Sequence, residues 1–233
     1  MKTLILLIVA FLPSVLLGLY IWYKDPQKEP KSWLICGFVL GGVVCSLVAM
    51  VEMGIEDILY DYYSPSSAIF GLLSNAFIAT AIPEESFKLL VLWILLRKNP
   101  YYDEHIDGIV YAVFIGLGFA AIENVRYLYG DANWITTALV RSLLAVPGHY
   151  AYAVTMGFYY SLYHFVEHSP KNAAFTLLMP VLLHGIYDSL AMSGRVNPYV
   201  GVVCFFILIV FCIRIHWMAR SKILALIRRD KKQ

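Results

Sequence analysis

The chain has 233 residues, of which 60% are hydrophobic and 15% charged, and its formal net charge at pH 7 is +2. This composition excludes an ordinary soluble domain, and so small a net charge gives no argument for a nucleic-acid partner. We therefore expect an all-α, multi-span membrane protein that forms a single domain over residues 1–233. The 4 cysteines fall inside apolar runs without ligand spacing, so neither a disulfide framework nor a thiolate metal site is indicated.

The first two apolar runs predict a pair of membrane-spanning helices. Residues 4–23 are long enough to span and are followed by no small-residue cleavage pattern, which favours a retained helix over a signal peptide. Lysines in the next loop mark it as cytoplasmic and place the N-terminus outside. Residues 33–53 return across the membrane, and the spacing of Gly37 and Gly41 would let another helix approach closely. The acidic, tyrosine-rich residues 52–63, without Lys or Arg, then predict an outer loop.

Two later apolar runs are too long for one perpendicular span, and each contains a proline. Residues 66–96 contain Pro83, and residues 134–165 contain Pro147. We expect two proline-broken helices, because interrupted backbone is tolerated within a membrane where it is buried in protein or faces a wet cavity.

Three ordinary spans complete the predicted topology, at residues 109–127, 172–190 and 199–217. The basic tail, residues 218–233, is the strongest cytoplasmic mark in the chain. About seven crossings, with the N-terminus outside and the C-terminus in the cytoplasm, satisfy the loop charges. The number rises to eight or nine if a broken run is really two segments. In the loop before residue 109, Asp107 occupies an N-cap position, and we interpret His105 as a solvated loop residue.

Adjacent carboxylates at Glu84 and Glu85 lie inside an apolar run, where ionisable residues are costly and usually functional. Lys88 follows Glu84 by four residues, in the favourable acid-before-base order on a helix. Glu85 is turned about 100° away from Glu84 by the helical period. One carboxylate could then be held by Lys88 while the other points elsewhere. An intrahelical salt bridge without further function is the structural alternative.

Acids and histidines on four predicted helices reach a similar depth in the membrane. At about 1.5 Å per residue from the cytoplasmic ends, Glu84 and His184 lie roughly 18 Å deep, and Glu123, His149 and Asp188 roughly 24 Å. In a hydrocarbon core of about 30 Å, all five fall in the outer half. Independent structural residues have no reason to share a level, so we predict one site.

Each of these residues also has a structural interpretation. His149 could satisfy a carbonyl of a broken helix, Glu123 and Asn124 could link helices by hydrogen bonds, and Asp188 could only orient His184. Taken together, they offer general bases, an imidazole acid and possible metal ligands. The predicted catalytic set is Glu84, Glu85, Glu123, His149, His184 and Asp188, supported by Lys88 and Asn124.

The chemistry of this set suits water activation. The familiar serine, aspartyl and zinc membrane-protease signatures GxSxG, GxGD and HExxH are missing. A carboxylate could take a proton from water while an imidazole stabilises the developing oxyanion. Two histidines with carboxylates could equally hold a zinc ion and leave one position open for water. A proton-coupled transporter and a non-catalytic membrane scaffold are the alternatives to an enzyme.

Four motifs in order resemble the PrsW family of bacterial intramembrane proteases. They are Glu84-Glu85-Ser-Phe-Lys88, the run from Asp107 to Glu123-Asn124, His149, and His184-Gly-Ile-Tyr-Asp188, which together cover about residues 80–190. That family is distantly similar to the CAAX-processing and bacteriocin-immunity membrane proteases, whose first motif is EExxxR. Here the basic residue Lys88 stands one position earlier, and Glu123 stands where those relatives have a histidine after FxxxH.

The resemblance implies an intramembrane endopeptidase of the bacterial cell membrane. Its substrate would be a single-pass anti-sigma factor, cut near its extracytoplasmic side to activate an envelope-stress sigma factor. By analogy, Glu84 would be the water-activating base, assisted by His149 and supported by Glu85, and His184 with Asp188 would stabilise the oxyanion. PrsW proteins are also described as metalloproteases, which would make His149, His184 and a glutamate such as Glu123 ligands of a divalent metal such as zinc.

Overall fold

The computed structural model describes residues 2–62 and 68–232, and within these ranges the chain is helical apart from short connections and contains no strand. The expected all-α fold is therefore confirmed. Five helical stretches are long and apolar enough to cross a membrane, as judged from length and composition. They are Thr3–Lys24, Lys31–Leu59, Asp107–Leu128, Pro170–Arg195 and Pro198–Asp230.

Two further helical rods are each assembled from α-helical pieces joined by π-helical turns. The first rod comprises α3 (Ala68–Ser74), a π-helical segment (Asn75–Ala81) and α4 (Ile82–Leu96). The second rod comprises α6 (Trp134–Val140), a π-helical segment (Arg141–Ala145), α7 (Val146–Ser161) and a last π-helical turn (Leu162–Val166). Within the described residues, five long helices and two composite rods occupy the predicted segments, and the number of membrane crossings stays a prediction.

The two prolines do not break their rods, which corrects the expectation of interrupted helices. Pro83 and Pro147 each lie in the first turn of an α-helix, where the missing N–H removes no intrahelical hydrogen bond. Just before them, the Ile82 N–H bonds to the Phe77 carbonyl and the Val146 N–H to that of Arg141, both five residues back. A π-turn accommodates one extra residue, and such turns occur frequently at functional sites.

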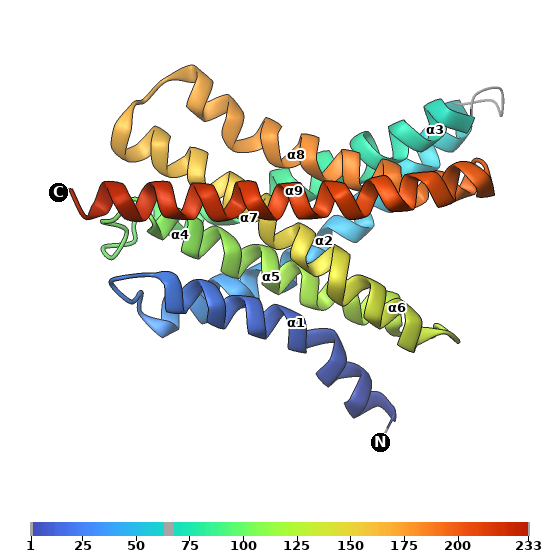
Figure 1. Cartoon of the computed structure of the whole chain (residues 1–233), viewed down its shortest axis with the longest axis horizontal. Coiled ribbons are helices and arrows are strands. Elements are labelled where there is room, and N and C mark those ends of the chain that lie inside the picture. Colours follow the sequence, from blue (N-terminus) through green and yellow to red (C-terminus); the bar gives the residue numbers. More distant parts are fainter. Residues whose placement is uncertain (1, 63–67, 233) are drawn as a thin grey trace.

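Consecutive rods run in opposite directions (Figure 1). The turn between α1 (Lys2–Lys24) and α2 (Lys31–Tyr62), the loop from α4 to α5 (Asp107–Leu128) and the C-terminus therefore lie at one end of the bundle, called here the C-terminal end. The N-terminus and the turn from α5 to α6 lie towards the opposite, N-terminal end. Helices α8 (Pro170–Met192) and α9 (Pro198–Asp230) also connect there.

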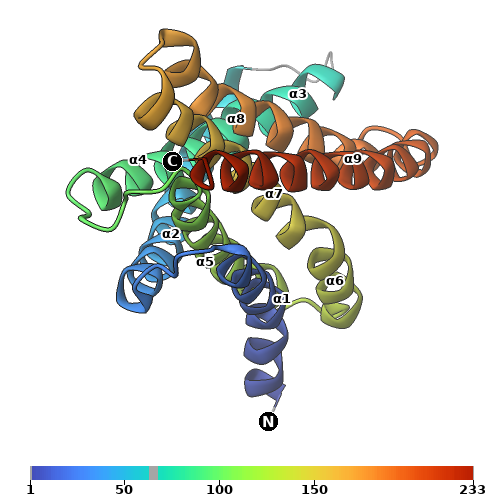
Figure 2. The same ribbon diagram turned by 60° about the vertical axis from the view of Figure 1, so that its left-hand side comes forward.

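Helix α5 forms the centre of the bundle, with α1 on one side and α9 towards the other (Figure 1 and Figure 2). It is buried along most of its length and packs closely on α2. A Cβ atom on Gly41 would clash with the carbonyl oxygen of Ile115, and one on Gly118 with that of Phe38. The prediction that Gly41 permits a close helix approach is confirmed, and the same contact fixes the helix that carries Glu123.

The predicted outer loop over residues 52–63 is wrong over most of its length, because α2 continues as a helix to Tyr62. Acidic residues mark where the chain leaves the apolar region, but they do not end a helix. The first proline after them is Pro65, within residues 63–67, which lie outside the described part of the chain, as does the predicted start of the next span at residue 66. The predicted basic tail is likewise the continuation of α9 as far as Asp230.

Two expectations about the α4–α5 loop are also wrong. His105 is not solvated: its side chain is buried, and its backbone N–H and Nδ1 lie 2.8 and 2.5 Å from Asp230 Oδ1 at the end of α9. Asp107 is not an N-cap but the first residue of α5. Its Oδ2 accepts hydrogen bonds from the backbone N–H groups of Asp103 and Glu104, so it caps the preceding loop.

Candidate active site

A polar cavity of about 460 Å³ lies among α2, the first composite rod, α5, the second composite rod and α8. Five of the six predicted catalytic residues line it, and Glu85 is the exception. Charged residues nearer the N-terminal end of the bundle also line it, and these were not among the predicted site residues. The first group is Glu84, Glu123, His149, His184 and Asp188, and the second is Glu52, Glu56, Arg126, Arg141 and Arg195.

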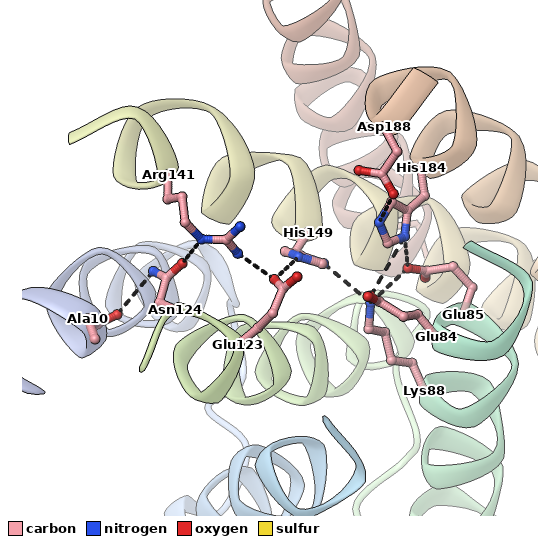
Figure 3. Close-up of polar contacts among 10 residues, drawn as sticks. All are labelled: Ala10, Glu84, Glu85, Lys88, Glu123, Asn124, Arg141, His149, His184 and Asp188. Atoms are coloured by element: carbon pink, nitrogen blue, oxygen red, sulfur yellow. Dashed lines mark hydrogen bonds and ion pairs between the residues drawn. The ribbon is translucent and has the colours of Figure 1, made fainter. Parts of the chain in front are cut away.

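The Lys88 ammonium holds both adjacent glutamates. Lys88 Nζ donates to Glu84 Oε2 and to Glu85 Oε1, each at 2.8 Å (Figure 3). All three residues are at most 4% exposed. The ring of Phe119 lies beneath the ammonium, with its centroid 4.0 Å from Nζ. The expectation that Lys88 holds one carboxylate while the other points elsewhere is wrong, because the α-helix brings both to the same cation at spacings of three and four residues.

His184 is enclosed by carboxylates. Its Nδ1 lies 2.9 Å from Glu85 Oε1 and 3.9 Å from Glu84 Oε2, and its Nε2 lies 3.3 Å from Asp188 Oδ2. The ring stacks on Tyr152, with centroids 5.0 Å apart. An imidazole with a carboxylate at each nitrogen can donate to both only when both nitrogens carry a proton. The surroundings of His184 therefore favour the imidazolium.

His149 connects the two halves of the polar network. Its Nε2 lies 2.8 Å from Glu123 Oε2, and its Nδ1 lies 3.3 Å from Lys88 Nζ. An ammonium can only donate, so Nδ1 accepts from Lys88 while Nε2 carries the proton shared with Glu123. This arrangement describes a neutral imidazole with a fixed tautomer, in contrast to His184.

Arg141 completes the network, and sequence reasoning missed it. Its Nη2 donates to Glu123 Oε2 at 2.6 Å and its Nε to Asn124 Oδ1 at 2.7 Å. Asn124 in turn donates from Nδ2 to the Ala10 carbonyl in α1, at 3.3 Å (Figure 3). Arg141 stands inside the predicted apolar run 134–165, so the argument applied to Glu84, that an ionisable residue within a span marks a functional site, would have found it.

The structure thus brings all eight predicted site residues into one connected network. The acids are Glu84, Glu85, Glu123 and Asp188, and the groups that oppose them are Lys88, Arg141 and the two histidines. Four helices of alternating direction contribute, as their similar predicted depths had indicated.

A divalent metal would find suitable donors in part of this network. One donor atom each of Glu84, Glu85 and His184 lie within 4.8 Å of one another, and carboxylate oxygen with imidazole nitrogen is a ligand set that zinc accepts. His149 and Glu123, which were predicted as ligands with His184, do not belong to this group. The Lys88 ammonium binds the same two carboxylates, so an ion held there would compete with Lys88.

Comparison with known proteins agrees with the resemblance found in the motifs. A family model described as "PrsW family intramembrane metalloprotease" matches residues 29–213, which include every site residue. Proteins named "Protease PrsW" are similar over most of their length. The relative from Bacillus subtilis (strain 168) is 34% identical over 179 residues, covering 76% of this chain and 78% of that protein.

Two further relatives carry the same name. That from Geobacillus kaustophilus (strain HTA426) is 31% identical over 214 residues, or 91% of this chain and 87% of the relative. The relative from Clostridioides difficile (strain 630) is 30% identical over 196 residues, which cover 80% of this chain and 79% of the relative. No solved structure matches the chain. A family match over most of the chain, together with these identities, establishes that the chain belongs to the PrsW family of intramembrane metalloproteases.

Proposed function

We propose that this chain is a membrane-embedded endopeptidase in which Glu84 activates the water that attacks a peptide bond. The observation that carries the proposal is the different placement of the two adjacent glutamates. Glu84 lines the polar cavity together with His149 and His184, whereas Glu85 lies behind it and bonds to Lys88 and His184. Substrate and water can therefore reach Glu84, while Glu85 positions its neighbours.

The proposed reaction begins with the transfer of a water proton to the Glu84 carboxylate. The water oxygen attacks the scissile carbonyl carbon. The oxyanion that forms receives a hydrogen bond from His184 Nε2–H, which turns towards it from Asp188, while Glu85 holds Nδ1. Glu84 then returns the proton to the leaving amine. His149 assists by fixing the Lys88 ammonium that orients the Glu84 carboxylate.

A metal-dependent version of the site has the support of the family description and of the convergent donors. Glu84, Glu85 and His184 would hold the ion, which when bound would polarise the carbonyl and the water. Lys88 would then have to release both carboxylates. The glutamate mechanism leaves the observed ion pairs intact, and we favour it for that reason.

Metal analysis combined with a cleavage assay separates the two versions. Purified protein is assayed on a candidate substrate with and without a zinc-selective chelator, in excess Mg²⁺ and Ca²⁺. The glutamate mechanism predicts unchanged cleavage and no stoichiometric zinc. Stoichiometric zinc that is lost in His184→Ala, together with loss of cleavage on chelation, would establish the metal version instead.

The charges at the two ends of the bundle support a definite orientation. Basic residues gather at the C-terminal end, among them Lys24, Lys31, Arg97, Lys98 and Arg228. Under the positive-inside rule that end is cytoplasmic, so the chain crosses seven times with its N-terminus outside. The cavity residues at the ends of α2, α5 and α8 then face the outer side, from which water has the shorter route.

We propose as substrate a single-pass membrane protein of the anti-sigma-factor kind, cut at or just outside the outer end of its transmembrane helix. A helical peptide bond keeps its carbonyl in the intrahelical ladder, so the cut segment must be unwound. Gly or Pro placed there should raise the rate, and runs of Leu or Ala should lower it. Mass spectrometry of both fragments decides the position: a cut near the substrate's cytoplasmic boundary would refute the orientation. A carrier, by contrast, would show solute flux in proteoliposomes.

A further inference from the structure

A second group of carboxylates lies at the C-terminal end of the bundle, away from the active-site network. Asp25 follows α1, Glu104 lies in the α4–α5 loop, and Asp107 is the first residue of α5. One carboxylate oxygen of each lies within 4.8 Å of those of the other two. Asp25 is 1% exposed and Asp107 0%. Three acids from separate parts of the sequence therefore converge, two of them fully buried and Glu104 half-buried.

Each of these carboxylates has one oxygen held by an N–H donor. Asp25 Oδ2 accepts from the backbone N–H of Glu29 at 3.2 Å, and Glu104 Oε1 accepts from Gln27 Nε2 at 2.7 Å. Asp107 Oδ2 accepts from the N–H groups of Asp103 and Glu104, at 3.1 and 2.7 Å. These bonds fix the orientation of all three groups before any ligand binds.

The second oxygen of each carboxylate is buried and has no hydrogen-bond partner in the part of the chain that the structure describes. These atoms are Asp25 Oδ1, Glu104 Oε2 and Asp107 Oδ1. Burying an unpaired carboxylate oxygen is costly, and native structures rarely keep such groups without a proton, a water molecule or a cation. Three such carboxylates, with one oxygen of each within 4.8 Å of the others, point to a positively charged ligand.

No basic side chain in residues 2–62 or 68–232 forms an ion pair with Asp25, Glu104 or Asp107. Lys28 lies close to Asp25, but its ammonium donates to the backbone carbonyls of Trp22, Tyr23 and Asp25. Burial raises the pKa of Asp25 to about 6. Among the described residues, the three carboxylates therefore have no directly bonded protein counter-ion.

Glu29 adds a further acid beside this group. Its carboxylate accepts a hydrogen bond from the hydroxyl of Tyr111, and burial raises its pKa to about 7. The donor set consists of oxygen atoms alone, without sulfur, and the one nearby imidazole, His105, is bound to Asp230. Carboxylate oxygens suit Mg²⁺, Ca²⁺ and Mn²⁺, whereas zinc prefers sites with nitrogen or sulfur.

We propose that Asp25, Glu104 and Asp107 form a binding site for a hard divalent cation of the Mg²⁺ and Ca²⁺ class, separate from the proteolytic site. The cation joins the α1–α2 turn to the α4–α5 loop and to the first residue of α5. Because α5 also carries Glu123 and Asn124, the cation stabilises the end of a helix that contributes to the active-site network.

The test uses the full-length purified protein with Ca²⁺, Mg²⁺ and Tb³⁺ as probes. After chelation, each divalent ion should raise the apparent Tm of the wild type by about 5–10 °C at a hundredfold excess over Kd. Tb³⁺ should become luminescent through energy transfer from nearby aromatic residues such as Tyr111, and Ca²⁺ should quench the signal by competition.

Substitutions identify the residues that bind the ion. Asp107→Asn removes a charge but keeps an oxygen that can accept the two loop N–H groups; it should weaken ion binding at least tenfold and abolish the Tm shift. Glu104→Gln, in the loop, should do the same and serves if Asp107→Asn does not fold. Asp103→Asn, an exposed acid of the same loop, is the matched control and should keep both signals, as should Glu84→Gln in the active site.

The outcomes are exclusive. An unchanged wild-type Tm with no Tb³⁺ signal would refute the site and indicate that Glu29 and Asp107 share a proton instead. If Asp103→Asn lost the Tm shift and the Tb³⁺ signal to the same extent, the effect would be one of diffuse charge. If only Glu84→Gln lost them, the ion would be bound in the active site. Either result would overturn the proposal.

Discussion

The two carboxylate clusters of this protein differ in how their charge is compensated. In the active-site network the acids face Lys88, Arg141 and His184, so almost every carboxylate has a cationic partner within the chain. At the C-terminal end, Asp25, Glu104 and Asp107 form no ion pair with any basic residue that the structure describes. Charges buried at low dielectric must be neutralised by a partner, a proton or an ion. The first cluster is therefore complete as folded, whereas the second has a place for a ligand.

The largest expected effect is on chemistry in the compensated cluster. Glu84→Gln should reduce the cleavage rate by about 10²–10⁴-fold, because the amide cannot accept the water proton. The protein should keep its expression level and helical content. The rate is measured on a candidate substrate in proteoliposomes, with Glu167→Gln, an exposed glutamate, as the control. A Glu84→Gln protein that cleaves normally would show that the cavity carboxylate is not the base.

Removing the central cation should turn the compensated cluster into an uncompensated one. Lys88→Met leaves two glutamates buried without their shared partner, which should lower the free energy of unfolding by about 3–5 kcal/mol. Thermal unfolding in detergent measures the loss. Adding Glu85→Gln to Lys88→Met should restore part of the stability, as a double-mutant cycle reports. A stable and active Lys88→Met would contradict the ion pairing described above.

A smaller effect is expected at the other end of the same network. Arg141 is partly accessible from the cavity, so Arg141→Met should cost about 1–3 kcal/mol by leaving Glu123 with one partner fewer. Glu123→Gln in the same protein should reduce the loss. Arg195→Met, an exposed arginine at the same cavity, serves as control in the same denaturation experiment, and a loss as large as that of Arg141→Met would argue against a specific ion pair.

The smallest effect should have the opposite sign. In chelator, Asp25→Asn should leave the free energy of unfolding unchanged or raise it by up to about 1 kcal/mol, because it removes one of several mutually repelling acids. Excess Ca²⁺ should reverse the order and make the wild type the more stable protein. Thermal unfolding with and without the ion measures both. A destabilised Asp25→Asn in chelator would show that this cluster is already compensated.

The sequence reveals those parts of the site that depend on composition and helical spacing. Glu84, Glu85 and His184 stand out because ionisable residues interrupt apolar runs, and Asp188 follows His184 at helical spacing. Which of these side chains bond to one another depends on tertiary packing. Nothing local states that His149 meets Glu123 across two helices or that Glu85 binds His184.

The errors in the fold have a similar origin. A proline indicates that one backbone donor is missing, but whether the chain opens or absorbs the defect in a wide turn depends on what packs around it, and here it forms π-helical turns before Pro83 and Pro147. Hydropathy locates the membrane-embedded part of α2 and not its helical end at Tyr62. The burial of His105 follows from the distant residue Asp230.

The number of residues in each π-helical segment sets the direction in which the side chains of the following helix, α4 or α7, point. Each extra residue rotates the following α-helix by about 100° relative to the preceding one. The segment Asn75–Ala81 ends three residues before Glu84, and Arg141–Ala145 ends four residues before His149. Deleting one residue from either segment would allow a regular α-helix to form and would turn its functional side chain away from the cavity. At these two places the active site depends on the number of residues as well as on their identity.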